Sequence, residues 1–315
     1  MPAQSQVISG LETAAERRPT YLAIGVFDGV HRGHQALLAD MAAAARAAGA
    51  RPAALTFFPH PSAVISGRSG RFYLCALEER IRLLGQTGVE LVVNQPFDQA
   101  LRQTSARDFV AQLRAALDLR QLWGASFSLG YRREGDLAYL QALGPELGFE
   151  VRPYDRLVEW AGRPVSSSRI RDALTAGELD EVAGCLGRPY HLRGRVVRGD
   201  GRGRTIGVPT ANLKLWDELL LPANGVYATL AEVDGRRYPA ATNIGHRPTV
   251  DGQSLSVEAH LLDFDADLYG RELELEFVRR LREERKFPGL DALVAQIRAD
   301  IEATRHWSAP AGRPG

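Results

Sequence analysis

The 315-residue sequence has few cysteines, few lysines and no long apolar run. Its two cysteines, Cys75 and Cys185, show neither CxxC nor metal-ligand spacing, which predicts a protein kept in reducing conditions. A membrane-spanning helix needs about 18 or more consecutive apolar residues, and no such run occurs. Residues 1–18 also lack the apolar centre of a signal peptide. These absences predict a cytoplasmic protein without a membrane partner.

An excess of one charge is absent as well, because 39 basic residues face 38 acidic ones. Dividing the sequence at residue 187 leaves 20 basic and 20 acidic residues before the cut, and 19 and 18 after it. Neither half is a polycation, which disfavours a nucleic-acid partner. Only Lys214 and Lys286 are lysines, so 37 of the basic residues are arginines. Biased genome composition explains most of them more simply than a preference for bidentate phosphate binding.

The length predicts two domains, and 45% hydrophobic residues are enough for two cores. In the first part of the chain, apolar runs alternate with helical patterns, which predicts an α/β fold with a parallel sheet. The expected strands cover residues 21–27, 52–58, 90–94, 121–125 and 149–153. The expected helices cover residues 34–48, 77–84, 106–117 and 137–147.

The pattern changes near Gly187-Arg188-Pro189, so we expect one domain over residues 1–186 and a second over 187–315. Asp234-Gly235 predicts a tight hairpin turn, and residues 290–304 have the pattern of a closing amphipathic helix. Short runs separated by turn residues predict a small antiparallel barrel or sandwich. These runs cover residues 192–197, 226–233, 237–242, 255–262 and 272–278.

A first candidate site lies where the first strand meets the first helix, in the segment GVFDGVHRGH of residues 25–34. Its three glycines allow a close approach of backbone to a ligand, and a helix N-terminus favours phosphate. His31 and His34 are three residues apart, so both rings can point towards one triphosphate. The segment is neither GxGxxG nor a P-loop. A His-x-x-His zinc site would need further ligands that the sequence does not place.

Ser166, Ser167 and Ser168 lead into a short predicted helix that carries Arg169 and Arg171. Hydroxyl and guanidinium groups suit a phosphate chain. Serines at this position also cap helices, and the residues alone support the two interpretations equally.

A second glycine-rich segment, GRVVRGDGRGRTIGVPTANL, covers residues 194–213. Gly199, Gly203 and Gly207 lie among arginines that include Arg204, and such a loop can wrap phosphates. Thr210 and Asn212 supply the hard oxygen ligands that Mg²⁺ prefers. By composition alone, a flexible basic loop followed by a tight turn is the favoured interpretation of the segment.

The motifs of the first part resemble those of a known family. His31-Arg32-Gly33-His34 resembles the HxGH motif of HIGH-type nucleotidyltransferases. The longer run over residues 25–34 resembles the adenylyltransferase half of prokaryotic bifunctional riboflavin kinase/FAD synthetases. LTFFPHP over residues 55–61 and VSSSRIR over 165–171 resemble their TFxPHP and VSSTxIR stretches.

The motifs of the second part resemble the riboflavin kinase half of the same family. Residues 194–213 resemble its GxVxxGxxxGRxLGFPTANL motif. Further segments follow in the family's order at residues 221–227, 242–249, 257–270 and 277–287. The resemblance implies a Rossmann-like HIGH-type nucleotidyltransferase domain with a parallel sheet and helices. It implies that a small antiparallel β-barrel riboflavin kinase domain with a C-terminal helix follows.

The resemblance also implies two reactions. The second domain would use ATP and Mg²⁺ to phosphorylate riboflavin to FMN, with Glu258 as general base. The first domain would adenylylate FMN to FAD and release pyrophosphate, which His31 and His34 would stabilise as catalytic residues. The expected partners are therefore small-molecule substrates, and the sequence predicts no oligomeric state.

The resemblance further implies which residues bind each ligand. In the first domain, nucleotide and phosphate would be held by Gly25, Phe27, Asp28, Gly29, Gly33, Ser166, Ser167, Ser168 and Arg171. In the second they would be held by Gly199, Gly203, Arg204, Gly207, Thr210 and Asn212, with Thr210 and Asn212 also on the metal. The flavin would contact Phe58, Pro59, His60, Pro61, Phe127 and Arg282.

One segment departs from the family pattern. Residues 124–130 read GASFSLG where the family has GxDFxFG, so Ser126 replaces an acidic or amide residue and Leu129 an aromatic one. This leaves an alternative function: a riboflavin kinase whose first domain is a weakened or regulatory nucleotidyltransferase. A second alternative, a nucleic-acid-related protein on the same fold, is disfavoured by the balanced charge of both halves.

Overall fold

The computed structural model describes residues 5–199, 201, 203, 206–249 and 252–308. The chain forms two compact units, Met1–Ser167 and Ser168–Gly315. The helices α7 (Ser167–Ala176) and α8 (Leu179–Leu186) therefore belong almost entirely to the second unit. The domain boundary at residue 187 stays a prediction.

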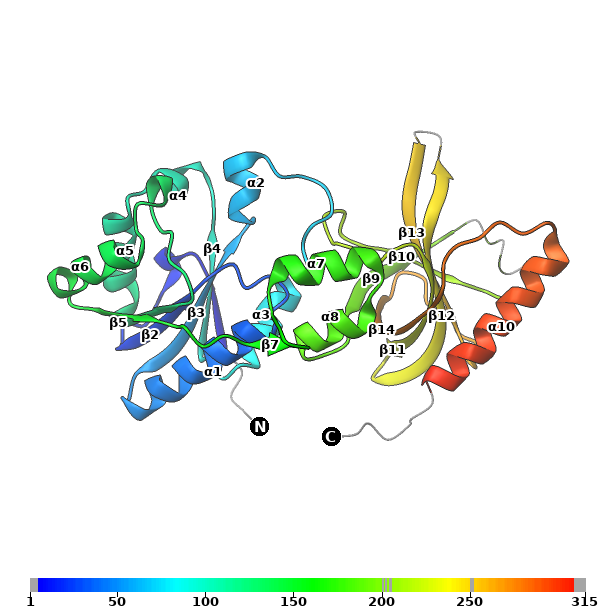
Figure 1. Ribbon diagram of the computed structural model, residues 1–315, viewed down its shortest axis with the longest axis horizontal. Coiled ribbons are helices and arrows are strands. Elements are labelled where there is room, and N and C mark those ends of the chain that lie inside the picture. The colour runs from blue at the N-terminus through cyan, green and yellow to red at the C-terminus, as the bar shows by residue number, and fades with distance from the viewer. Residues whose placement is uncertain (1–4, 200, 202, 204–205, 250–251, 309–315) are drawn as a thin grey trace. The chain divides into compact units, whose positions relative to one another are not determined.

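The first unit is a three-layer α/β structure around a six-stranded parallel sheet (Figure 1). Helices α1 (Arg32–Ala47) and α3 (Leu77–Gly85) cover one face, and α5 (Ala106–Leu117) and α6 (Leu137–Leu147) cover the other. The predicted parallel sheet with helical crossovers is confirmed. In spatial order the strands are β1 (Gln6–Ser9), β4 (Leu91–Pro96), β3 (Arg51–Phe58), β2 (Thr20–Ile24), β5 (Leu119–Gly124) and β6 (Glu150–Pro153).

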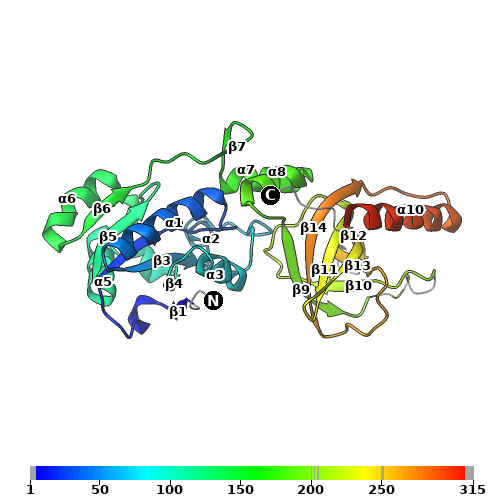
Figure 2. The ribbon, with the colours of Figure 1, turned by 90° about the horizontal axis from the view of Figure 1, so that it is seen from below.

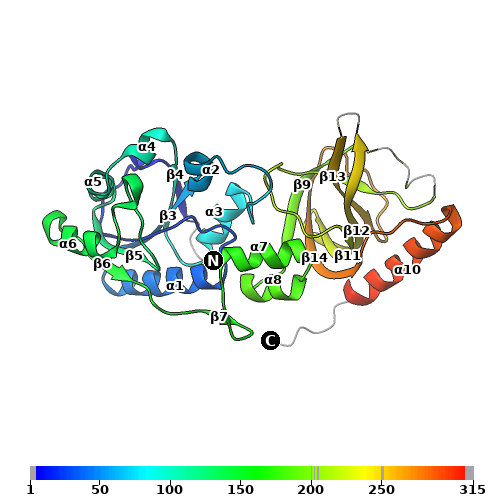
Figure 3. The same cartoon turned by 45° about the horizontal axis from the view of Figure 1, so that its top comes forward.

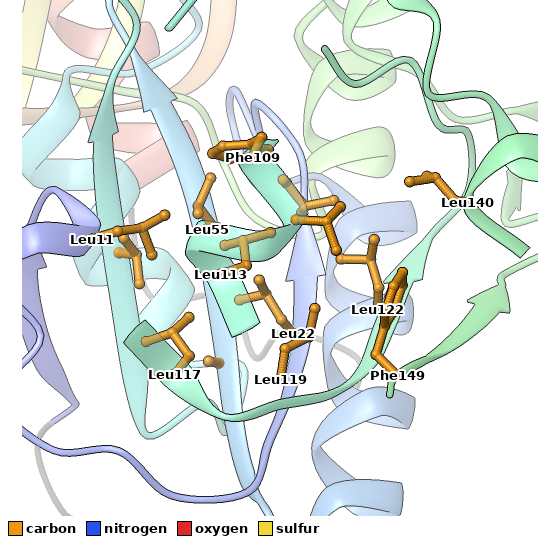
Figure 4. Packing of buried hydrophobic residues seen from close by; sticks show 14 of the residues in the cluster. Leu11, Leu22, Leu55, Phe109, Leu113, Leu117, Leu119, Leu122, Leu140 and Phe149 are labelled. Atoms are coloured by element: carbon orange, nitrogen blue, oxygen red, sulfur yellow. The ribbon is translucent and has the colours of Figure 1, made fainter. Parts of the chain in front are cut away.

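Both faces of the sheet are buried, which explains why its strands appear in the sequence as continuous apolar runs. Leu22 and Leu55 point to the side on which Phe109 and Leu113 of α5 pack (Figure 4). Ala23 follows Leu22 in β2 and pairs with Ala54 of β3, and both point to the α1 side. Small residues on that side let α1 approach closely, while leucines and phenylalanines fill the other layer.

The order β3-β2-β5 creates a topological switch point in the sheet. From β2 the chain proceeds to β3 on one side, and β5 pairs with β2 on the other. Loops after such strands diverge at the carboxyl edge and leave a crevice, which is where open α/β sheets bind ligands. The segment of residues 25–31 leaves the sheet at this edge, directly after β2.

Short elements complete the first unit. They include the helices α2 (Pro61–Ser66) and α4 (Gln99–Gln103), and the 3-10 turns η1 (Leu11–Thr13) and η2 (Tyr131–Arg133). A two-residue hairpin, β7 (Glu159–Trp160) and β8 (Arg163–Pro164), immediately precedes α7 (Figure 2).

The second unit is a closed antiparallel barrel, which confirms the predicted barrel class (Figure 3). The turn at Asp234 and Gly235 has both φ angles positive, 51° and 75°, as a two-residue hairpin turn requires. Helix α10 (Leu290–Ser308) packs against the strands β11, β12 and β14. Around the barrel the strands are β10 (Ala211–Lys214), β13 (Gly252–Leu261), β12 (Arg236–Thr249), β11 (Gly225–Val233), β14 (Glu272–Arg282) and β9 (His191–Val197).

Side chains alternate between the two faces of the barrel wall. In β13, Val257 and Ala259 are 2% and 0% exposed, whereas Glu258 and His260 between them are partly exposed. The predicted orientation of Glu258, away from the core, is confirmed. Within the described residues, no helix is long and apolar enough to cross a membrane.

Candidate active sites

The two histidines of the first site stack at the start of α1. His31 is the N-cap residue, and its Nδ1 accepts the backbone N–H of His34 at 3.3 Å. The two imidazole rings lie 3.6 Å apart at 17°. Because Nδ1 accepts, a neutral His31 carries its proton on Nε2. Capping thus fixes the tautomer of His31, with the ring proton on Nε2.

His34 lies deeper in the same site. The ring of Phe27 meets it edge-on at 5.2 Å, and its Nδ1 is buried without a hydrogen-bond partner in the described structure. Burial lowers the pKa of His34 well below 6.5, and the charges of His31 and Arg80 lower it further. A neutral ring with an unused buried nitrogen is a position at which a ligand can complete the hydrogen bonding.

The turn before α1 is tightly bent. Phe27, Gly29 and Val30 have φ angles of 51°, 75° and 39°, in the left-handed region. A Cβ atom at Gly33 would lie 3.2 Å from the His31 ring, and one at Gly25 would lie 3.1 Å from the Phe27 ring. These two glycines therefore make room for the chain's own rings, and their role in nucleotide binding stays a prediction.

Asp28 is only 2% exposed, and its side chain stabilises the turn through buried contacts. Its two carboxylate oxygens accept the backbone N–H of Leu74 at 3.0 and 3.1 Å, and Arg80 Nη2 lies 3.6 Å from Oδ1. This carboxylate ties the first turn to residues 72–75. A direct contact of Asp28 with nucleotide stays a prediction.

The predicted flavin segment forms an aromatic edge beside this site. Strand β3 ends at Phe58, the Phe58–Pro59 peptide is cis, and the backbone N–H of His60 donates to the Tyr73 hydroxyl at 2.7 Å. The rings of Phe58 and Tyr73 lie 5.9 Å apart, and Phe72 stacks on Tyr73 at 4.2 Å. Clustered rings favour a flat aromatic ligand. His60 Nδ1 accepts the N–H of Ser62 and caps α2, with Pro61 at the first helical position.

The segment Ser166–Ser168 contacts the first site through one hydrogen bond to its backbone. Ser167 Oγ donates to the carbonyl of Asp28 at 3.3 Å. Arg169 pairs with Glu181 of α8 at 2.6 Å. Ser166 lies beside Ser167 in the chain, and Ser168 and Arg171 follow in α7, in the second unit. The roles of Ser166, Ser168 and Arg171 on phosphate stay predictions.

The segment of residues 124–130, whose sequence differs from the family pattern, has a well-defined backbone conformation. A Cβ atom at Gly124 would lie 2.9 Å from the Phe127 ring, which packs over that glycine and against the core. The backbone of Leu129 pairs with Gly135 in both directions, at 3.1 and 2.9 Å. Ser126 is exposed and takes no part in this pairing. The two replacements therefore leave the frame of the loop intact.

The second site lies on the outer wall of the barrel. Asn212 of β10, Glu258 of β13 and Asn243 of β12 are direct cross-strand partners. All three side chains are partly exposed, whereas their chain neighbours Ala211 and Ala259 are buried. Paired strands therefore hold one carboxylate and two amides in a row.

The glycine-rich segment brings further groups to this row. Thr210 Oγ1 donates to Glu258 Oε2 at 3.3 Å. A Cβ atom at Gly199 would lie 2.5 Å from the Asn212 side-chain nitrogen, so the loop backbone passes directly beside that amide. Gly203 accepts the N–H of Val208 at 2.8 Å in a tight turn, and Gly207 has a φ of 76°. The predicted residue Arg204 lies outside the described residues.

Two residues beside this row were missed by sequence reasoning. Asn243 Nδ2 donates to Glu284 Oε1 at 3.4 Å, and the Glu284 carboxylate occupies the space that a side chain at Gly245 would fill. Strand register could have found Asn243, since it faces Glu258 across β12 and β13. Glu284 follows β14 and gave no such signal.

A cavity of about 580 Å³ adjoins Thr210 on the same barrel. Its walls are polar and apolar in about equal part and include Val196, Leu261 and Phe264 together with Asp265 and Asp267. The Arg198 guanidinium lies 5.4 Å from the ring centre of Tyr269 in that wall. Thr210 both lines the cavity and contacts Glu258, so the cavity adjoins the second candidate site.

Arg282 serves the fold in a way that the sequence did not indicate. Its Nε and Nη2 contact the carboxylate of Asp300 in α10 at 3.1 and 2.8 Å, and Nη1 donates to the carbonyl of Glu283. Asp300 is 5% exposed. The guanidinium also lies 5.7 Å from the ring centre of Phe287. It fastens α10 to β14, and its contact with flavin stays a prediction.

The donor set at the second site suits a hard cation better than a transition metal. Thr210, Asn212 and Glu258 offer hydroxyl, amide and carboxylate oxygens, the ligand types of Mg²⁺. In the part of the chain that the structure describes, no group of three or more His, Cys, Asp or Glu side chains forms a metal site. Mg²⁺ does not need such a cluster of side chains, because the ion usually keeps several of its water ligands.

Comparison with known proteins gives a family match for each part of the chain. The family model described as FAD synthetase matches residues 13–169, and the one described as Riboflavin kinase matches residues 186–308. A bifunctional riboflavin kinase/FMN adenylyltransferase of Pseudomonas fluorescens is 39% identical over 309 residues, which is 97% of this chain and 98% of that protein. This chain belongs to the bifunctional riboflavin kinase/FMN adenylyltransferase family.

Other members of the family are similarly close. The bifunctional riboflavin kinase/FMN adenylyltransferase of Listeria monocytogenes is 38% identical over 91% of this chain and 92% of its own length. A crystal structure described as a macrolide-efflux protein from Streptococcus pneumoniae has 31% identity and a TM-score of 0.86. It covers 96% of this chain and 99% of that one. The fold of this chain is therefore similar to that solved structure over nearly the whole length of both.

Proposed function

We propose that this chain makes FAD from riboflavin in two steps, phosphorylation in the barrel unit and adenylylation in the α/β unit. The observation that carries the proposal is the presence in one chain of the stacked His31–His34 pair and the Thr210–Glu258 pair. The first pair stands at a helix N-terminus, which favours phosphate, and the second places a carboxylate beside a hydroxyl.

In the kinase step, Glu258 takes the proton from the terminal ribityl hydroxyl of riboflavin. The hydroxyl oxygen bonds to the γ-phosphorus of ATP, the bond to the β-phosphate oxygen breaks, and ADP leaves. Thr210 donates to Glu258 and so orients the carboxylate. Thr210 and Asn212 would hold Mg²⁺, which supplies charge neutralisation of the phosphates. Gly199, Gly203 and Gly207, together with Arg204, are the proposed phosphate-binding residues.

The cavity beside Thr210 is the proposed seat of the adenine base. Its apolar wall residues Val196, Leu261 and Phe264 would pack on a flat base, and Thr210 in its lining connects it to Glu258. Riboflavin would lie at Asn243 and Glu284, which contact each other beside Glu258. The hydroxyl of riboflavin and the γ-phosphate of ATP would then meet at Glu258.

In the adenylylation step, a phosphate oxygen of FMN attacks the α-phosphorus of ATP. The bond to the β-phosphate oxygen breaks and pyrophosphate leaves, so no side chain needs to take a proton. His31 donates from Nε2 to the departing phosphates, and the N–H groups at the start of α1 add positive potential. Phe58, Pro59, His60, Pro61 and Phe127 would contact the isoalloxazine ring.

The finer assignments go with this proposal. The two activities would divide at residue 187, Mg²⁺ would be the metal, and the enzyme would act in the cytoplasm on small-molecule substrates without nucleic acid. The alternative of a weakened first unit is not favoured, because His31 and His34 are in place and Ser126 lies outside the loop's hydrogen bonds.

Product analysis tests the proposal. Purified protein is incubated with riboflavin, ATP and MgCl₂, and flavins are separated by chromatography over time. FMN that appears first and FAD that follows would support both steps. FMN without FAD, even when FMN is supplied directly, would reject the adenylylation step. A well-folded protein that makes neither product would reject the proposal as a whole.

A further inference from the structure

Arg80 of α3 is a charged side chain in the core of the first unit. It is 0% exposed and is the largest fully buried side chain in the described structure. No sequence motif pointed to it, and none of the steps above uses it. A buried guanidinium is costly unless it is well paired, so its position needs a physical reason.

The guanidinium touches four groups from three segments. Nη1 donates to Thr56 Oγ1 at 3.3 Å and to the Phe57 carbonyl at 3.1 Å. Nη2 lies 3.6 Å from Asp28 Oδ1, and the group lies 5.8 Å from the ring centre of Tyr73. A single side chain therefore joins the turn before α1, the end of β3 and residues 72–75.

Each of these contacts leads to a residue of the proposed adenylylation site. Asp28 lies three residues before His31 in the same bent turn. Phe57 precedes Phe58, and Tyr73 accepts the backbone N–H of His60. Thr56 Oγ1 also donates to the carbonyl of Val26 in the first turn, at 2.7 Å. Arg80 thus connects the nucleotide side and the flavin side of the site.

The pairing of Arg80 is incomplete. Its Nε and Nη2 make no hydrogen bond in the described structure, although both are buried. Asp28 accepts the N–H of Leu74 with both oxygens, which leaves Arg80 a longer ionic contact only. Arg282, by contrast, uses all three of its nitrogens. A side chain that served stability alone would be expected to pair as Arg282 does.

We propose that Arg80 is a positioning residue of the adenylyltransferase site, which locks the His31–His34 turn to the flavin edge and keeps positive charge beneath the histidines. The inference rests on the proposed function. A buried, preorganised charge next to the place where negative charge develops on pyrophosphate acts at low dielectric and needs no reorganisation. It also disfavours a proton on His34.

The groups that face His34 define what a pH profile would report. His31 faces it from the helix cap and Arg80 from α3, and Asp28 pairs with Arg80. The positive charge of Arg80 lowers the pKa of His34, so removing that charge raises the pKa. His34 then binds a proton at higher pH, and the acidic limb of the adenylylation rate moves to higher pH.

The test compares Arg80→Lys, Arg80→Gln and the control Arg82→Gln. Arg82 lies on the same helix but is half-exposed and pairs with Glu79. For FMN-to-FAD conversion, Arg80→Lys is expected to lower kcat about tenfold with little change in either KM, because the charge stays and the forked contacts are lost. Arg80→Gln is expected to lower kcat about 100-fold and to shift the acidic limb upward. Arg82→Gln should behave as wild type.

Riboflavin phosphorylation by the same chain is the internal control for folding. Wild-type kcat and pH profile in folded Arg80 variants would overturn the inference. If Arg80→Gln does not fold, Arg80→Lys decides by its kcat alone, and a wild-type value overturns the inference. A wild-type protein that makes no FAD from FMN would instead overturn the proposed function, and the inference with it.

Discussion

The hydroxyl of Thr210 lies 3.3 Å from a carboxylate oxygen of Glu258, at the point where β10 begins to pair with β13. Glu258 lies within a strand of the closed barrel, and Thr210 directly precedes the neighbouring strand β10. Sites built on paired strands hold their groups more closely than sites on loops alone. The relationship makes Glu258 the first residue to change.

Replacing Glu258 with glutamine should abolish FMN formation and leave FMN-to-FAD conversion unchanged. Glutamine keeps the size of the side chain but cannot take a proton, and loss of a general base costs about 10²- to 10⁴-fold in rate. The two reactions are measured separately, with riboflavin or FMN as substrate. Glu232→Gln, at an exposed position on the outer face of β11, is the matched control. Equal loss of both activities would contradict the two-site assignment.

Two replacements of His31 separate its capping role from its chemistry. Asparagine is a good N-cap, whereas alanine is a poor one, and losing a cap costs about 1 kcal/mol. His31→Asn and His31→Ala should both slow FAD formation by about 10²-fold or more, as expected for loss of a donor to developing charge. Only His31→Ala should lower the thermal unfolding temperature. Riboflavin phosphorylation should be unchanged in both, and retained FAD formation in His31→Asn would remove the ring from the mechanism.

Gly199→Ala should weaken the kinase without unfolding the barrel. The new methyl group would lie 2.5 Å from the Asn212 amide nitrogen and push that side chain aside. Asn212 is a proposed Mg²⁺ ligand, and misplacing a catalytic group by about 1 Å can cost about 100-fold in rate, so we expect slower FMN formation and a higher MgCl₂ requirement. Gly289→Ala, where a Cβ atom has no neighbour within 4 Å, is the control. An unchanged MgCl₂ dependence would place the metal elsewhere.

Asp300→Asn should lower the stability of the barrel unit more than the removal of an exposed ion pair does. Its carboxylate is buried and pairs with Arg282, and removing one partner of a buried pair costs about 3–5 kcal/mol. Chemical denaturation measures this loss. Asp263→Asn removes an exposed contact to Arg305 and should change little. If the two variants are equally stable, α10 is not fastened through Arg282.

Stability should also depend on pH through His34. Its pKa in the folded protein is lowered by burial, so the unfolded chain binds a proton there more readily. The contribution to stability is full above pH 6.5 and is lost as the pH falls below 6.5 towards the folded pKa. Thermal unfolding followed from about pH 7.5 to about pH 5.5 should decline more steeply in wild type than in His34→Gln. Parallel curves would contradict this.

Local signals predicted many elements well. Helices over residues 106–117 and 137–147 were predicted, and α5 and α6 have these bounds because Ser105 and Asp136 cap them. Strand β12 covers residues 236–249 and was predicted only over 237–242. The prediction stopped early because the later part of the strand contains a glycine and a proline, which are typical of turns. The four-residue β10 was missed inside the glycine-rich segment of residues 194–213. Pairing with β9 and β13 forms it, and pairing is not visible in a local window.

The candidate sites show the same division. Histidine, serine and glycine in unusual patterns identified the turn before α1 and the loop before β10. Asn243 and Glu284 were not found, because their position beside Glu258 depends on strand register and on the chain path after β14. Arg80 follows two glutamates and looks like one more exposed helix charge. Only the packing of α3 on the sheet shows that it is buried.

The alternation of faces along β13 limits how this barrel can change in length. One residue added before Glu258 within the paired region would turn that carboxylate into the apolar interior and expose its neighbours to water. Deletions there would have the same effect, whereas substitutions among the inward-facing residues leave the outer row undisturbed as long as the interior stays filled. The function of the site therefore depends on the register of the strand pairing as strictly as on the identity of any side chain.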